Sequence, residues 1–122
     1  GGGAAEGGEE TVEGSGRGGG VVPGTVAVEA EGKVAAPGEV VAQARQAFSN
    51  VRTVAVTAGA SITDVTKVTW YVVDYRSELL PALAAARREV FGDHAPASTL
   101  IGVKALVRPE YLVEVEAVAV VE

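Results

Sequence analysis

The C-terminal part of the chain alternates between two kinds of residue with the period of a β-strand. In the run 113–121 one side of the predicted strand holds only Val and Ala, because successive strand residues point to opposite faces. The other side holds Glu114 and Glu116 together with Val118 and Val120. A surface sheet has one apolar face and one wet face. This pattern therefore predicts that both faces are covered, one of them by another subunit.

A second predicted strand covers residues 96–107 and is joined to the first by a turn at residues 108–110. In a hairpin with this turn, Lys104 lies opposite Glu114. A cross-strand ion pair of this kind contributes about 0.2–1 kcal/mol. Two interpretations of Glu114 therefore stay open: a partner for Lys104 within the sheet, or a side chain that contacts a ligand.

Two stretches repeat apolar residues at three- and four-residue steps and are predicted to be helices. The first runs over residues 39–58 and is stopped by Gly59. The second begins with Ser77 as its cap, carries Glu78 near its positive end, and ends at Gly92. The first stripe consists of Val40, Val41, Ala44, Ala47, Phe48, Val51, Val54, Ala55 and Ala58, with Glu39, Gln43, Gln46, Asn50 and Arg52 outside it. The second consists of Leu79, Leu80, Leu83, Ala86, Val90 and Phe91.

Three further runs are predicted to be strands. Residues 65–73 are the richest in β-forming side chains, and we expect Trp70 there to pack in a core or interface rather than to line a pocket. Residues 21–30 form a strand interrupted at Pro23, and residues 33–35 return after a tight turn. Strands that alternate with helices predict an α/β fold with a mixed sheet and both helices on one face. The other face then needs cover, which implies self-association.

Glycine dominates the beginning of the chain. Residues 1–20 contain ten of the sixteen glycines, and glycine loses the most entropy on ordering while burying nothing. We expect a flexible lead at residues 1–20 and a single domain at residues 21–122. A phosphate-binding loop is disfavoured, because no GxxxxGK[ST] pattern is present.

Composition narrows the possible functions. The chain has no cysteine and one histidine, His94, so neither a thiolate site nor a multi-histidine metal site is available. We expect His94 to be a loop or helix-end residue rather than a catalytic one. The net charge of -6 disfavours nucleic acid as a partner, because nucleic-acid affinity is mostly cation-driven. No apolar run is long enough to span a bilayer, so we expect a cytoplasmic protein with no membrane partner.

Five short motifs, taken together, resemble one known family. They are AQxRQxxxNV, AGAS, DVxKVTxYVxD, FGDHxPA and VExEAxAV, in this order between Thr25 and Val121. The chain is similar in these motifs to the Rid family (reactive intermediate deaminases, also called YjgF or endoribonuclease L-PSP proteins). The resemblance implies a chorismate-mutase-like fold and a homotrimer, with a small-molecule ligand cleft between neighbouring subunits.

The resemblance also implies a chemistry. Active family members hydrolyse enamine or imine intermediates to a carbonyl product and ammonia, with no metal or organic cofactor. An arginine holds the substrate carboxylate, because a guanidinium binds it through two parallel hydrogen bonds. A glutamate of the last strand orients or deprotonates the attacking water.

The family's functional positions map onto this chain only in part. The catalytic glutamate falls on Glu114, whereas the arginine falls on Ser98, followed by Thr99. A Ser-Gly-Gln segment of the family falls on Pro23 to Thr25, so Gly24 is kept and Thr25 is the remaining substrate-binding candidate.

Two functions follow from this partial match. The first is imine or enamine deamination, with the usual 2-imino acids disfavoured because Ser98 replaces the arginine. The alternative is a non-catalytic trimer that binds a small metabolite or serves a regulatory role. The acidic balance and the absence of an aromatic-basic patch make ribonuclease activity the least favoured reading.

Overall fold

The computed structural model describes residues 10–14, 24–31 and 39–121 of the chain. These residues form five strands and two α-helices in the order β1, β2, α1, β3, α2, β4 and β5. The strands are β1 (Glu10–Gly14), β2 (Gly24–Glu31), β3 (Val65–Val73), β4 (Ala97–Val103) and β5 (Val113–Val121), and the helices are α1 (Val40–Thr57) and α2 (Leu80–Phe91). Short 3-10 turns at Ile62–Asp64 and Ser77–Leu79 precede β3 and α2.

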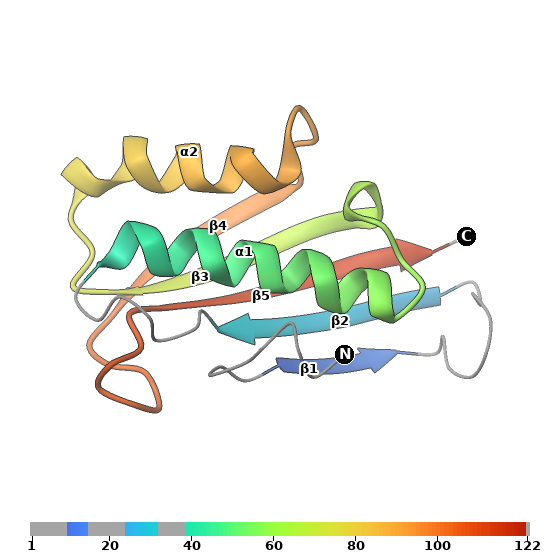
Figure 1. Cartoon of the computed structure of the whole chain (residues 1–122), viewed down its shortest axis with the longest axis horizontal. Coiled ribbons are helices and arrows are strands. Elements are labelled where there is room, and N and C mark those ends of the chain that lie inside the picture. Colours follow the sequence, from blue (N-terminus) through green and yellow to red (C-terminus); the bar gives the residue numbers. More distant parts are fainter. Residues whose placement is uncertain (1–9, 15–23, 32–38, 122) are drawn as a thin grey trace.

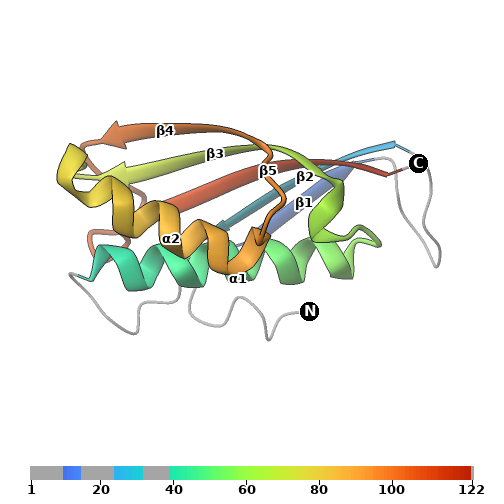
Figure 2. The same ribbon diagram turned by 90° about the horizontal axis from the view of Figure 1, so that it is seen from above.

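The strands form one mixed sheet in the order β1-β2-β5-β3-β4. All neighbours are antiparallel except β3 and β4, which run parallel. Both helices lie on the same face of this sheet (Figures 1 and 2). The predicted fold class, a mixed sheet with two helices on one face, is confirmed.

The predicted closing hairpin is wrong. Strand β4 pairs with β3 alone, and β5 lies between β2 and β3 in the middle of the sheet. The residues opposite Glu114 are Tyr71 in β3 and Glu31 in β2, so the sheet does not pair Glu114 with Lys104. The physical reason is the crossover through α2, which returns the chain parallel to β3. The connection from β4 to β5 then carries the chain past β3.

The N-terminal lead contains a strand that its composition did not predict. Residues 10–14 pair with β2 as the edge strand β1 (Figure 1). The segment has the sequence ETVEG with a single glycine, and its backbone hydrogen bonds to β2 hold it as a strand. Strand β2 begins at Gly24, within the predicted run 21–30. The predicted return strand at 33–35 and the rest of the lead lie outside the described residues.

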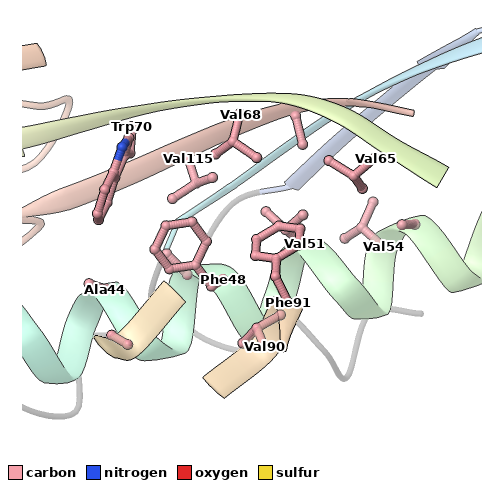
Figure 3. Packing of buried hydrophobic residues seen from close by; sticks show 14 of the residues in the cluster. Ala44, Phe48, Val51, Val54, Val65, Val68, Trp70, Val90, Phe91 and Val115 are labelled. Atoms are coloured by element: carbon pink, nitrogen blue, oxygen red, sulfur yellow. The ribbon is translucent and has the colours of Figure 1, made fainter. Parts of the chain in front are cut away.

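The core lies between α1, α2 and the helix-facing side of the sheet. Phe48 at its centre makes edge-to-face contacts with Trp70 and Phe91, at ring-centroid distances of 5.1 and 5.9 Å (Figure 3). Trp70 is therefore a core residue, as predicted. The apolar face of β5 is buried as well, at Val113, Val115, Ala117, Ala119 and Val121.

The helices follow the predicted stripes with three differences. Gln43 and Asn50 lie outside the predicted apolar stripe of α1, yet both are buried. Ser77 does not cap α2, because it starts the 3-10 turn that precedes this helix. Leu80 is exposed rather than part of the buried stripe of α2. It is the first residue of this helix and lies at its N-terminal end.

Local backbone features at the helix ends agree with the sequence pattern. Gly59 and Gly92 adopt the positive φ angles, 91° and 60°, that favour glycine after a helix. Its own backbone N–H and the Ser77 hydroxyl lower the pKa of the Glu78 carboxyl. The two glycines therefore end the helices where the sequence predicted, whereas Glu78 lies in the 3-10 turn before α2 and not in the first turn of that helix.

His94 has a structural partner in the loop between α2 and β4. Its Nε2 atom lies 2.6 Å from the carbonyl oxygen of Val65 at the start of β3. A carbonyl only accepts, so Nε2 is the donor. The half-buried ring also lies 6.3 Å from the ring of Phe91. His94 therefore fastens the loop to the sheet, which matches the expectation of a helix-end residue.

Two valines of α1 provide a matched test of this core. Val51 is fully buried and Val56 is 58% exposed. We expect Val51→Ala to lower the free energy of unfolding by about 2 kcal/mol, through lost burial and a residual cavity. Val56→Ala should change it by less than about 0.5 kcal/mol. Urea denaturation at one protein concentration measures both, and equal losses would contradict the assigned helix face.

Candidate functional site

The face of the sheet away from the helices carries the acidic pair of β5. Glu114 and Glu116 are half buried there, and Val120 on the same side is 40% exposed. The predicted alternation of β5 is thus confirmed, with one face in the core and the other bearing the two acids. In the single chain this second face, called the open face below, is not covered by a helix (Figure 2).

Tyr71 is the closest described neighbour of the acids across the sheet. It lies directly opposite Glu114 in the register of β3 and β5, and its hydroxyl donates a 2.5 Å hydrogen bond to Oε1 of Glu116. The sequence reasoning missed Tyr71 as a site residue. The alternation of residues 65–73 puts Tyr71 and Trp70 on different faces of the strand. The wrongly predicted hairpin of β4 and β5 obscured the fact that β3 is a neighbour of β5.

The second neighbour of β5 adds two more acidic positions. In the register of β2 and β5, Glu31 lies opposite Glu114 and Glu29 lies opposite Glu116. The register therefore places acidic residues of β2 and β5 opposite one another at two positions.

Ser98 and Thr99, the predicted substrate-binding residues of β4, are both exposed but belong to opposite sides of the sheet. Ser98 pairs with Val68, which is buried under the helices, and Thr99 pairs with Thr69 on the open face. A spacing of about 4.8 Å between strands and a rise of about 3.3 Å per residue put the Cα atoms of Ser98 and Glu114 roughly 14 Å apart.

Gly24 and Thr25 lie at the far end of the sheet from Glu114. They open β2 opposite Val121 and Val120, so about six residues of strand, or about 20 Å, separate Thr25 from Glu114. One chain therefore does not bring the five predicted site residues together. A ligand that touched all of them would need residues from more than one copy.

A hollow lies at the turn after β3. It has a volume of about 440 Å³ and is lined by Asp74, Tyr75 and Arg76. Asp74 adopts a positive φ of 53°, a conformation that Asp tolerates better than most residues. None of the predicted site residues lines this hollow.

The described residues contain neither a metal-binding cluster nor a membrane-spanning helix. No group of three or more His, Cys, Asp or Glu side chains in this part of the chain is placed to hold a metal ion. Neither helix described here has the length and apolar character needed to cross a membrane.

Comparison with known proteins gives consistent matches. The sequence model of the family described as Endoribonuclease L-PSP matches residues 18–121. The 2-iminobutanoate/2-iminopropanoate deaminase of Dermatophagoides farinae is 32% identical over 80 residues, which are 66% of this chain and 60% of that protein. A RutC family protein of Pyrococcus abyssi is 30% identical over 98 residues, or 80% and 75% of the two chains.

A solved structure also matches along most of the chain. The crystal structure of a member of the YjgF/YER057c/UK114 family from Mycobacterium tuberculosis superposes with a TM-score of 0.71 at 27% identity. The match covers 93% of this chain and 100% of that one. This chain spans only about 60% of the length of the Dermatophagoides deaminase, so the activity of that protein does not transfer by similarity alone.

The hydrogen bond from Tyr71 to Glu116 can be tested by removing one oxygen atom. We expect Tyr71→Phe to lower the free energy of unfolding by about 1.5–3 kcal/mol, the usual net contribution of a hydrogen bond to a carboxylate. Tyr75→Phe is the matched control, because no hydrogen bond of the Tyr75 hydroxyl is found among the described residues. Urea denaturation measures both variants. A loss in Tyr71→Phe no larger than in the control would show that the bond does not form in solution.

Proposed function

Because the chain belongs to the endoribonuclease L-PSP family, which contains the Rid and YjgF proteins, we propose that it hydrolyses reactive imine or enamine intermediates to a carbonyl product and ammonia. The observation that carries the proposal is the half-buried Glu114 on the open face of the central strand. A carboxylate held in a fixed register on a face that no helix covers is suited to activate water.

Glu114 would act as the general base of this reaction. It takes a proton from water while the water oxygen forms a bond to the electrophilic carbon of a protonated imine, and the C=N bond becomes a single bond. The nitrogen of the resulting carbinolamine then takes up that proton. The C–N bond breaks as the C=O bond forms, Glu114 takes the hydroxyl proton, and ammonia leaves; that proton then passes to the ammonia, which is released as ammonium. Water is the only co-reactant, so no metal or organic cofactor is required.

The groups around Glu114 favour a substrate that donates hydrogen bonds. The Tyr71 hydroxyl gives its only hydrogen to Glu116, so its oxygen can act toward a ligand only as an acceptor. The carboxylates of Glu114 and Glu116 accept as well. A protonated imine, C=NH2+, supplies hydrogen-bond donors and a positive charge, both of which carboxylates bind well.

The same site is poorly suited to a substrate carboxylate. Ser98 stands where the family's arginine would hold that group. A hydrogen bond to a charged group contributes about 1.5–3 kcal/mol, so losing the arginine weakens carboxylate binding by roughly ten- to several-hundred-fold. We therefore infer that the substrates are imines without a carboxylate, as formed from amines, rather than 2-imino acids.

A homotrimer with clefts between subunits accounts for two features of the chain. The open face exposes Val120 and Ile101, which are 40% and 39% accessible. Burial of such side chains by another copy is favourable, at about 25 cal/mol per Å² of apolar surface. In addition, the predicted site residues lie far apart in one chain.

The alternative, a non-catalytic trimer that binds a small metabolite, is favoured by one observation. Ser98 lies on the other side of the sheet from Glu114, so within one chain the two cannot grip the same ligand. Under this alternative, a ligand would raise the melting temperature without turnover. The stabilisation would persist when Glu114 is replaced by glutamine.

Ammonia release from imines generated in place separates the two functions. An amine oxidase supplies imines without a carboxylate, and an amino-acid oxidase supplies 2-imino acids. We expect the wild type to accelerate ammonia release from the first class, and Glu114→Gln to lose about 10²- to 10⁴-fold of that acceleration. No acceleration with either class would contradict the deaminase proposal and leave the binding function.

Ser98→Arg tests, in the same assay, which class of imine the protein accepts. If the missing arginine limits carboxylate binding, this variant should gain about ten- to several-hundred-fold in kcat/KM for 2-imino acids. Thr66→Arg, on an exposed position of β3, controls for an added positive charge. An equal gain in both variants would indicate general attraction of anions rather than a restored contact.

Subunit association through the open face is tested with two lysine variants. Val120→Lys places a charge on the open face, whereas Val56→Lys places one on the exposed side of α1. Sedimentation equilibrium should give a trimer for the wild type and Val56→Lys, and a smaller species for Val120→Lys, because a buried unpaired charge is costly. A monomeric wild type, or a trimeric Val120→Lys, would contradict assembly through this face.

A further inference from the structure

A buried glutamine of α1 holds the segment that leads into β5. Gln43 is only 1% exposed, although it lies outside the apolar stripe of its helix. Its Nε2 atom donates to the carbonyl oxygen of Glu110 at 3.0 Å, and its Oε1 atom accepts from the backbone N–H of Leu112 at 2.7 Å. One side-chain amide thus bonds to two backbone groups that lie two residues apart.

Two backbone hydrogen bonds also hold the segment from Lys104 to Leu112 within the described part of the chain. Tyr111 N–H donates to Arg108 O at 3.1 Å, and Val73 N–H donates to Leu112 O at 2.9 Å. Leu112 is therefore held from two sides, by β3 through its carbonyl and by Gln43 through its N–H. Leu112 directly precedes Val113, where β5 begins, so these hydrogen bonds fix the backbone at the start of the strand.

We propose that Gln43 is a positioning residue for Glu114, a role that rests on the catalytic role proposed above. Glu114 follows Leu112 by two residues and lies on the same side of the strand. A shift of the strand by one residue would turn Glu114 toward the helices and an apolar side chain toward the open face. By fixing the backbone at Leu112, Gln43 sets the orientation of the Glu114 carboxylate and its distance from a bound ligand.

The arrangement is specific to an amide side chain at this place. Only a group with a donor and an acceptor side by side can bond a carbonyl and an N–H that are two residues apart. Both of those backbone groups would lack this partner if an apolar side chain took its place, and unpaired buried polar groups are avoided in folded proteins. Gln43→Met keeps nearly the same shape and removes both hydrogen bonds.

The matched control is Gln46→Met on the same helix. Gln46 donates to Asn50 Oδ1 at 2.9 Å, so its bond stays within α1 and does not reach β5. Each substitution is made in the wild-type background and in the Glu114→Gln background. Steady-state ammonia release from amine-derived imines then gives kcat and KM per folded protein for the six proteins.

A positioning role predicts a particular pattern. Gln43→Met should lower kcat by about a hundredfold, the typical effect of a misplacement of about 1 Å, with KM changed by less than about threefold. Gln46→Met should leave kcat within about twofold. In the Glu114→Gln background Gln43→Met should cause no further loss, because the side chain that it positions is already disabled. Equal losses from Gln43→Met in both backgrounds would overturn the proposal.

Residue-resolved amide hydrogen exchange tests the positioning role of Gln43 without a measurement of catalytic turnover. In Gln43→Met the amides of Leu112 and Glu114 should exchange about 10- to 100-fold faster, while that of Val51 in α1 changes by less than about threefold. Unchanged exchange at Leu112, or a uniform increase at all three, would overturn the positioning role. A wild type that turns over no imine would contradict the proposed function alone, and the exchange pattern would still decide the role of Gln43.

Discussion

Pairing of β5 on both edges is the constraint on which the rest of the structure depends. This strand lies between β2 and β3, and its apolar face closes the core beneath the helices. Because strand residues alternate, fixing that face in the core also fixes Glu114 and Glu116 on the open face. The position of the candidate base is therefore a consequence of how the core is packed, and Gln43 adds a bond at the point where the strand begins.

The two faces of the sheet consequently differ in what they can do. The helix side is densely packed around Phe48 and Trp70. The open side combines exposed valine with the two acids of β5, and the Tyr71 hydroxyl donates a hydrogen bond to one of them. Apolar surface favours association with another copy, and carboxylates accept hydrogen bonds from a ligand. These two tendencies together support clefts that form only when subunits meet.

Local periodicity predicted the elements well. Helix α1, strand β3 and the two faces of β5 follow directly from the spacing of apolar residues, because each pattern lies within a single element. The neighbours of β5 could not be predicted in this way, since adjacency depends on the crossover through α2. The mistaken hairpin led to the Lys104 pairing and hid Tyr71.

Other features depend on partners that no local pattern specifies. Gln43 looks like a surface residue by spacing, yet it is buried and bonds to the distant chain before β5. The candidates Ser98, Thr99, Gly24 and Thr25 came from family resemblance, and the register shows them dispersed over one chain. In the proposed trimer, contact among them would depend on subunit packing, which the sequence of one chain does not describe.

A crystal structure of the assembled protein with bound acetamidine would test the central claim most directly. The amidinium group is planar and cationic and resembles a protonated imine, but it resists hydrolysis. The account predicts that its N–H groups lie within about 3 Å of the Glu114 carboxylate, in a cleft to which two copies contribute. An assembly in which Glu114 is sealed within a subunit contact, with acetamidine absent from it, would contradict the account.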